Sequence, residues 1–330
     1  MSVEQELATD HSDPAQLLAS LRRDYSGLSS RIRDLRHSVT SNCSGVTFRL
    51  HFPALRDGAA TVSDLVNVVV RYLTVFALPR SRIAELDEQI GQISADEFRL
   101  RTLALQQEAT SLFMRSQQAT RRNGEAGELL LFLLTEWALE APQLLAKMSL
   151  KTNREMPVHG SDGIHVKYCP VNKKLLLYWG ESKIHKDVGK AVSSAVTSIV
   201  TALKDENINH ELKLVERFID LSGLTPAAKA AVLGHLDPLD ERSNQRINIT
   251  TCLIGFDFDA YEKNEVIKSP DPEAAFRLLA IAKLGELAPR VATALANAGI
   301  HDHKIELFFF PVPSVETLRD LFQAAIGWKR

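Results

Sequence analysis

The sequence has few cysteines and no two of them are close together. Its three cysteines, Cys43, Cys169 and Cys252, are spread over 330 residues, which argues against a disulfide framework and favours a reducing compartment. Because no CxxC pair occurs, a zinc site built on thiolates is not expected. The GxSxG, HExxH, GxGxxG and P-loop motifs are missing as well, which excludes several common enzyme classes.

Long apolar runs and a basic net charge are also lacking. The apolar stretches at 65–78, which Arg71 interrupts, and at 129–134 are too short or too broken to span a bilayer. Residues 1–10 are acidic and polar, unlike a signal peptide, so we expect a cytoplasmic protein with no membrane partner. The formal net charge of −2 does not favour nucleic-acid binding. Residues 147–190, however, hold nine Lys or Arg against four Asp or Glu.

Three parts follow one another along the chain. Residues 1–13 are predicted to be disordered, residues 14–120 to form a mainly helical N-terminal region, and residues 121–330 to form a second domain. Apolar residues at alternating steps of three and four predict a helix over 14–37, which either packs on its own domain or binds a partner. The apolar residues of this pattern are Leu18, Leu21, Tyr25, Leu28, Ile32 and Leu35.

Helix and strand patterns alternate through the rest of the chain. This mixture predicts an α/β (α+β mixed) fold, in which a helical N-terminal region precedes a mixed β-sheet flanked by helices. The predicted strands are 46–52, 164–168, 175–183, 247–258 and 304–311. The predicted helices are 63–78, 81–118, 125–147, 186–204 and 272–298.

Two charged residues end one apolar strand pattern. Glu181 and Lys183 follow the apolar run 175–179, and because strand side chains alternate, both project to one side with Ser182 opposite. Asp162 occupies a glycine-flanked turn nineteen positions earlier (181 − 162), where it can lie beside Glu181 across a hairpin. Separately these motifs are common, as a surface ion pair and as a turn. Their order around two consecutive strands favours a shared site.

A metal ion would explain two carboxylates placed side by side. Adjacent carboxylates repel unless a cation lies between them, and oxygen ligands suit Mg²⁺, with Mn²⁺ as a substitute. Asp162 and Glu181 are the predicted ligands, and Lys183 either acts on the attacking water or stabilises transition-state charge. His159 and His165 flank Asp162, but a histidine-rich site would suit zinc better.

Further candidates surround this core. Glu125 is explained by the dipole of the helix that it starts, so Glu128, which lies against the leucine run, is the preferred third acid. The basic residues either bind DNA phosphates without regard to sequence or are plain surface charges. The candidates for phosphate binding are Lys147, Lys151, Arg154 and His185.

Several longer segments resemble the HamA family, the nuclease subunits of the Hachiman anti-phage defence system. The resemblance covers nearly all of the chain after about Val46. The segments that carry it are HFPALRDG at 51–58, ALPR at 77–80, GELLLF at 127–132, PQLLAKMSLKTN at 142–153, HGSDGIH at 159–165, GESK at 180–183 and ELFFFP at 306–311.

The resemblance implies a PD-(D/E)xK nuclease core within residues 121–330. On this match Asp162 and Glu181 are metal ligands, Lys183 is the catalytic lysine and Glu128 is the helical acid. The chain departs from the motif in having no proline before Asp162. The resemblance further implies DNA as substrate, and a HamB-like helicase that senses aberrant or foreign DNA and controls the nuclease.

The predicted function is therefore that of a Mg²⁺-dependent deoxyribonuclease, the effector of an anti-phage defence system under the control of a partner helicase. The alternative is a non-catalytic interaction subunit that docks on and regulates a helicase. Such a subunit need not bind Mg²⁺, and mutation of Lys183 would leave its biology intact. In either case, the helical region up to about residue 120 is the hypothesised docking surface.

Overall fold

Seven strands form the centre of the protein. The computed structural model describes residues 14–35, 45–120, 124–151, 160–222, 224–237 and 239–328. The strands of the main sheet are β1 (Ile32–Leu35), β2 (Val46–Pro53), β5 (Gln143–Leu145), β6 (Gly163–Cys169), β7 (Lys174–Ile184), β8 (Arg246–Asp257) and β9 (Lys304–Val312), and a separate small hairpin joins β3 (Leu55–Arg56) to β4 (Ala59–Ala60).

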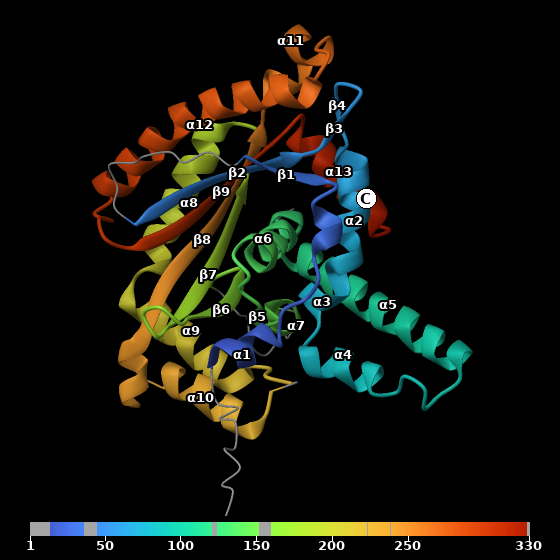
Figure 1. Ribbon diagram of the computed structural model, residues 1–330, viewed down its shortest axis with the longest axis vertical. Helices are drawn as coiled ribbons and strands as arrows, with labels where there is room; N and C mark the ends of the chain where they lie inside the picture. Colours follow the sequence, from blue (N-terminus) through green and yellow to red (C-terminus); the bar gives the residue numbers. More distant parts are fainter. Residues whose placement is uncertain are drawn as a thin grey trace, which may run out of the picture.

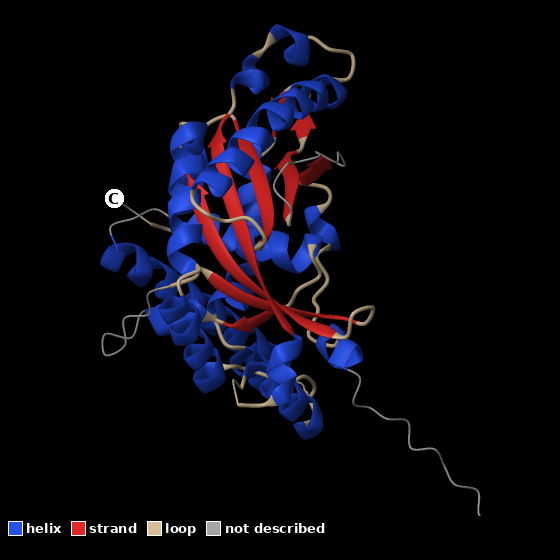
Figure 2. Ribbon diagram, turned by 90° about the vertical axis from the view of Figure 1, so that its left-hand side faces the viewer, coloured by secondary structure: helices blue, strands red, loops and turns tan. Residues whose placement is uncertain are grey.

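The main sheet is mixed. Its strand order is β1-β2-β9-β8-β7-β6-β5, and the four inner strands from β2 to β7 are parallel to one another. At the two edges, β1 pairs antiparallel with β2, and β6 pairs antiparallel with both β7 and β5. Figure 1 shows these strands crossing the middle of the molecule, and Figure 2 shows the twist of the sheet. The predicted fold class, a mixed sheet flanked by helices, is confirmed.

Helices surround this sheet. The α-helices are α1 (Pro14–Ala19), α2 (Val62–Val69), α3 (Leu73–Ala77), α4 (Arg80–Asp87), α5 (Ala95–Thr120), α6 (Glu125–Ala138), α7 (Lys147–Lys151), α8 (Val188–Ala202), α9 (Asp205–Phe218), α10 (Pro226–Leu236), α11 (Asn264–Ile267), α12 (Pro272–Asn297) and α13 (Val315–Ala325). Short 3-10 turns complete the set: η1 (Ser26–Leu28), η2 (Val70–Tyr72), η3 (Glu241–Gln245) and η4 (Asp259–Glu262).

The two faces of the sheet bury different helices, because strand side chains alternate. On one face Leu253 and Phe308 pack with the leucine run of α6 and with α2, α3 and α13. On the other face Cys252 and Phe309 pack with α8 and α12. A third cluster, at the end of the sheet formed by β5, β6 and β7, packs with α1, α9 and α10, which lie together at the bottom of Figure 1. Helix α8 therefore covers the face opposite to α6.

The helix predicted over residues 14–37 is wrong. Helix α1 ends at Ala19, and the chain continues through η1 into β1. Asp24 accepts hydrogen bonds from the backbone N–H and the hydroxyl of Ser26 at 2.8 and 3.1 Å, and the Ser29 hydroxyl bonds to the Ser26 carbonyl at 2.7 Å. Such local bonds compete with a helix.

The apolar residues of that pattern are nevertheless buried, as in the alternative of packing on the protein's own domain. All six are at most 5% exposed, so they form no exposed seam for a partner. These side chains are buried along a short helix, a turn and an edge strand, in which Ile32 lies opposite Pro53. The sheet thus includes strands from both sides of residue 120 and does not itself mark a domain boundary.

The helix predicted over 125–147 is too long. Helix α6 ends at Ala138, Glu140 has a positive φ of 54°, and Pro142 has no backbone N–H to continue a helix. The chain then forms β5 at the edge of the sheet and the short helix α7. Helices α9 and α10 were not predicted, and α9 is important for the site described below.

Among the described residues, no single helix is long and apolar enough to cross a membrane. One pair of helices, Val62–Ala77 and Arg80–Asp87, passes the test of length and composition together but is bent by 99°.

Candidate active site

Strand β7 presents two charged side chains to helix α8. Glu181 and Lys183 form a direct ion pair, and the Ser198 hydroxyl of α8 hydrogen-bonds to the Glu181 carboxylate. The predicted alternation is confirmed, because Gly180 faces Leu131 of α6, on the other side of the sheet. Both charged groups line a cavity of about 420 Å³ between the sheet and helices α8 and α9.

Asp162 lies beside this pair, at the start of β6. Its backbone N–H donates to the Gly180 carbonyl at 2.6 Å. Its Oδ2 accepts hydrogen bonds from the Ser182 N–H at 2.8 Å and from the Ser182 hydroxyl at 3.1 Å. Asp162 therefore contacts the residues on both sides of Glu181, across the hairpin, as the sequence spacing predicts.

Two glycines face each other where β6 and β7 pair, and a larger residue there would be too close to its neighbours. Gly163 pairs with Gly180, and a Cβ added at Gly180 would lie 3.2 Å from the Gly163 nitrogen and 3.2 Å from Leu131 Cδ2. These distances are shorter than ordinary van der Waals contacts. The small residues let β6 and β7 approach closely enough for Asp162 to reach Ser182.

The charged groups of the site shift one another's pKa values, because they lie close together. Burial raises the pKa of Glu181, and the Asp162 carboxylate raises it further, although Lys183 and Ser198 oppose this. Burial alone would lower the pKa of Lys183, but Glu181 and Asp162 outweigh it and raise that pKa. The thiol of Cys252, opposite Glu181 on β8, has its pKa raised by burial and by Glu181, so it is no nucleophile at neutral pH.

The donor set of this site fits a divalent cation that prefers oxygen. Asp162 and Glu181 supply two carboxylates, and Mg²⁺ in proteins is commonly held by one or two carboxylates, with water and substrate phosphate completing its shell. Within the described ranges, no three His, Cys, Asp or Glu side chains converge on one point. If a cation binds here, Asp162 and Glu181 would supply part of its shell, and water and substrate would have to supply the rest.

A buried network holds the residue before Asp162. Lys147 donates from Nζ to the Ser161 carbonyl at 2.7 Å and to Glu211 of α9 at 2.6 Å. Glu211 in turn accepts from the Ser161 hydroxyl at 3.0 Å and from its N–H at 3.2 Å. Gly160 precedes this turn with φ of +132°, and a side chain there would collide with Glu211.

This network corrects the prediction that Lys147 binds phosphate. The Lys147 side chain is 2% exposed and is paired with Glu211, which is 7% exposed. A charge this deep is stable only when it is paired, so the pairing explains its burial. Lys147 positions the Asp162 turn and does not present its ammonium to a ligand at the surface.

The remaining predicted residues are placed less directly. Glu128 is half-buried in α6, next to Gly127, where an added Cβ would lie 3.2 Å from Ser182 Oγ. Glu128 is not among the residues that line the cavity, and its role as third acid stays a prediction. The structure describes the backbone of Lys151 but not its side chain, and Arg154 and His159 lie outside the described residues.

The two histidines nearest the motif differ. His165 is buried against Phe132 and hydrogen-bonded to the Ala141 carbonyl at 2.9 Å, and burial lowers its pKa to about 4. It is a neutral core residue. The backbone of His185 continues the pairing of β7 with β8, and burial, Arg319 and Lys183 lower the pKa of its half-buried side chain. Its contact with phosphate stays a prediction.

Several residues of the cavity were missed by the sequence reasoning. Only Thr197 and Thr201, four positions apart on the predicted helix at 186–204, gave a signal, because this spacing places them on one helical face. Besides Glu181, Lys183 and Glu211, the cavity is lined by Gly160, Ser161, Trp179, Thr197, Ser198, Thr201, Ala202, Leu203, Asn207, Ile208, His210, Asn248 and Thr250.

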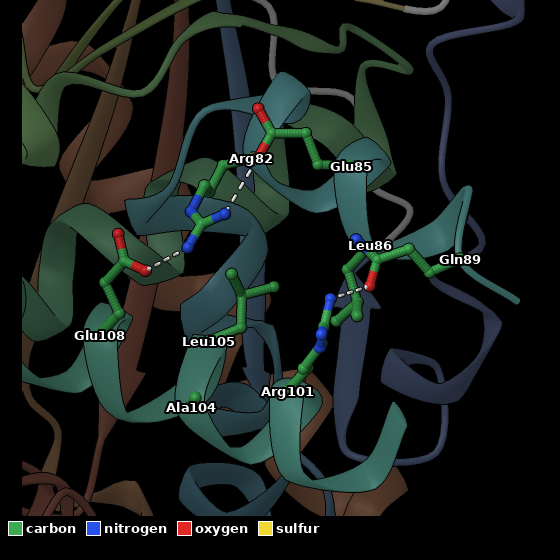
Figure 3. A pocket seen from close by; sticks show the side chains of 8 residues that line it. All are labelled: Arg82, Glu85, Leu86, Gln89, Arg101, Ala104, Leu105 and Glu108. Atoms are coloured by element: carbon green, nitrogen blue, oxygen red, sulfur yellow. Dashed lines mark hydrogen bonds and ion pairs between the residues drawn. The ribbon is translucent and has the colours of Figure 1, made fainter. Parts of the chain in front are cut away.

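A second cleft, of about 310 Å³, lies between α4 and α5 (Figure 3). Its charged groups pair with one another: Arg82 contacts Glu85 at 2.9 Å and Glu108 at 3.6 Å, and Arg101 donates to Gln89 at 2.6 Å. These contacts tie the two helices together, and the cleft is remote from Glu181. We therefore do not assign it as the active site.

The fold and the site together define a class of protein: a mixed α/β protein with an Asp…Glu-x-Lys site on adjacent strands. The chain belongs to the HamA family, which matches residues 30–326. This family is a component of the Hachiman anti-phage defence system, which also includes a helicase. The resemblance noted in the sequence is thereby confirmed. A comparison with curated proteins finds no match.

Proposed function

We propose that the protein is a metal-dependent DNA nuclease and the effector of its defence system. The observation that carries this proposal is the contact of Asp162 with both neighbours of Glu181, beside Lys183. Glu181 and Lys183 line one cavity, and Asp162 lies next to them at the start of β6. Two neighbouring carboxylates and an ammonium suit phosphodiester hydrolysis, in which a nucleophilic water and a negatively charged phosphoryl group must be held together.

Each side chain has a part in this proposal. Bound Mg²⁺ would supply an activated water and neutralise charge on the phosphoryl oxygens. Asp162 and Glu181 would hold the metal, with Ser182 fixing the first carboxylate and Ser198 the second. Lys183, already within ion-pair distance of Glu181, is suited to stabilise the charge that develops on the phosphate.

Plasmid degradation tests the proposal. The wild type and a Glu181→Ala/Lys183→Ala variant are compared with Mg²⁺ or Mn²⁺, each with and without the helicase of the system. A matched control is Lys186→Ala/Glu316→Ala, which removes an ion pair whose side chains are both 63% exposed. We expect cutting by the wild type and the control and at least a hundredfold loss in the site variant. Equal cutting by all three proteins would refute this site, and the absence of all cutting would favour the non-catalytic interaction subunit.

We further propose that the helicase docks on the arm formed by α4 and α5. Figure 1 shows this pair projecting from the side of the sheet. Helix α5 carries two strongly exposed apolar side chains, and the connection from α4 to α5 carries a third. These are Ile90, Leu100 and Leu103, which are 66%, 63% and 55% exposed. Leu100 and Leu103 lie one turn apart on α5, and adjoining exposed apolar residues are typical of interaction surfaces.

A charge on this arm should weaken docking. We expect Leu100→Glu/Leu103→Glu to reduce co-purification with the helicase at least tenfold, because a buried, unpaired carboxylate is unfavourable in an interface. The matched control is Leu239→Glu, at a residue 94% exposed elsewhere. If both variants retain the helicase equally, the arm is not the docking surface.

A further inference from the structure

The cavity extends along the sheet beyond the charged residues. Trp179 precedes Glu181 and Lys183 on the same side of β7, so the cavity floor extends from Lys183 over four residue steps, about 13 Å along the strand. Asn248 and Thr250 of β8 complete this floor, and Thr250 is paired with Trp179 in the sheet. The walls come from helices α8 and α9.

The chemistry of the lining changes along this floor. Among the described residues that line the cavity, Lys183 is the single Lys or Arg, and it stands at one end. The acids are already engaged, Glu181 with Lys183 and Glu211 with Lys147. Away from Lys183, the walls carry threonine hydroxyls that donate to carbonyls of α8, and Asn207, whose amide N–H donates to the Thr201 carbonyl at 2.6 Å. The oxygens of these groups can accept hydrogen bonds, and the imidazole of His210 also lines the wall. Such a lining suits an uncharged, hydrogen-bonding group better than a second phosphate.

Trp179 and Asn248 lie at the end of the cavity away from Lys183, where their side chains contact each other. The indole N–H of Trp179 donates to Asn248 Oδ1 at 3.3 Å, which orients the amide. No described residue accepts a hydrogen bond from the amide NH₂ of Asn248, so it remains available as a donor. A base offers ring or carbonyl acceptors that the amide can bind, and an aromatic face that can contact the accessible part of the indole, which is 7% exposed.

We propose that this cavity binds one unpaired nucleoside of the strand being cut, next to the phosphate at Lys183. The substrate is then single-stranded or locally unpaired nucleic acid. This inference rests on the proposed nuclease function and specifies its substrate. A cavity of about 420 Å³ is of the size that holds a small molecule. A base that is still paired and stacked in a duplex cannot reach into such a cavity, whereas an extruded or single-stranded base can.

The test blocks the cavity mouth and measures binding. Thr197→Phe places a ring at an exposed position that lines the cavity. Its matched control is Ser193→Phe, one turn earlier on the exposed side of α8 and outside the lining. Both hydroxyls bond to backbone carbonyls of their own helix, at 3.0 and 3.2 Å. Both changes are made in a full-length Glu181→Gln background, so that no substrate is cut.

Fluorescence anisotropy with Mg²⁺ then compares a labelled single-stranded oligonucleotide with its blunt duplex. In the Ser193→Phe protein we expect the single strand to bind about tenfold more tightly than the duplex. In the Thr197→Phe protein we expect the affinity for the single strand to fall by about that factor, as expected for the loss of one stacked base. Duplex binding should change less than twofold. Equal weakening for both substrates, no weakening, or no single-strand binding by the control would overturn the proposal.

A second variant, on β8, tests the same cavity without changing α8, so a folding defect of α8 cannot explain both results. Asn248→Leu removes the amide at nearly constant volume, and we expect it to weaken single-strand binding several-fold while circular dichroism stays unchanged. Because neither assay depends on cleavage, a failure of the nuclease proposal is separable from this one. If the wild type cuts no DNA while the variants bind as expected, the nuclease proposal is refuted. If the wild type cuts duplex DNA while the variants do not bind as expected, the nucleoside proposal is refuted.

Discussion

At the scale of single residues, the contact between Lys147, Glu211 and Ser161 determines where Asp162 can lie. Strand alternation was enough to predict that Glu181 and Lys183 share a side, because it is a local rule. The partner of Lys147 could not be predicted in the same way. Glu211 is 64 positions away, on a helix that the sequence pattern did not reveal.

Removing the partners of this network one at a time and together should separate stability from activity. Glu211→Met leaves the Lys147 ammonium buried without its carboxylate, and we expect it to lower the free energy of unfolding by about 3–5 kcal/mol. Adding Lys147→Met removes the buried charge and should restore much of the stability. Cutting should stay impaired in the double variant, because the Asp162 turn is no longer held.

The measurements are urea unfolding and the Mg²⁺ concentration that gives half-maximal cutting. The exposed pair Lys186 and Glu316, replaced in the same way, is the control and should change neither. Full recovery of both stability and cutting in the double variant would reduce the network to a purely structural role.

His165 should make the protein less stable in mild acid. Its pKa is lowered by burial from 6.5 to about 4 in the folded state, so below pH 6.5 the unfolded chain takes up a proton that the folded protein does not. The free energy of unfolding should therefore fall as pH drops from about 6.5 to about 4, by up to about 3 kcal/mol.

Urea unfolding at a series of pH values checks this. His165→Asn keeps a donor for the Ala141 carbonyl but does not titrate, and its stability should depend less on pH over the same interval. An unchanged slope in this variant would assign the acid sensitivity to other groups.

At the scale of elements, the alternating run at 46–52 and the apolar, β-prone runs were predicted almost to their ends. Strands β2, β6, β7, β8 and β9 match their predicted ranges to within two residues. The N-terminal pattern failed because apolar steps of three and four also fit a turn and a strand, and because Asp24 and nearby serines bond to the local backbone. Periodicity predicts which residues are buried more reliably than it predicts the element that buries them.

The pairing of β6 with β7 should be sensitive to one methyl group. Gly180→Ala brings a Cβ to within 3.2 Å of the Gly163 nitrogen, and backbone atoms in a sheet yield little. We expect a loss of about 1–3 kcal/mol in stability and weaker Mg²⁺-dependent cutting, because Asp162 shifts with β6.

The matched change is Gly285→Ala in α12, where the added Cβ meets nothing within 4 Å. It should raise stability by about 0.5–1 kcal/mol, since alanine favours helix more than glycine. Thermal unfolding and plasmid cutting on both variants decide the matter. A Gly180→Ala protein with normal cutting would show that Asp162 tolerates movement.

At the scale of the whole molecule, the sheet joins distant parts of the chain. Strand β2 pairs with β9, more than 250 positions later, and no local pattern specifies such a neighbour. The order of helix and strand patterns along the chain predicted a mixed sheet. It did not predict that β1 and β2 would belong to that sheet.

Deletion of residues 1–35 should therefore destabilise the protein as a whole. The six apolar side chains of this segment are buried, at about 1.5–3 kcal/mol each, against a typical total stability of about 5–15 kcal/mol. We expect an insoluble or unfolded product, measured by circular dichroism and by gel filtration. A folded truncated protein would show that β2 needs no cover at this edge.

Helix α9 couples the width of the cavity to the position of Asp162. Its Glu211 lies on the cavity wall and, through the same carboxylate, grips the residue before Asp162. A displacement of α9 that opened the cavity more widely would also loosen the turn that carries Asp162. If the proposed nuclease function holds, a ligand too bulky for the cavity would therefore displace Asp162 from Glu181 and would be cut less well.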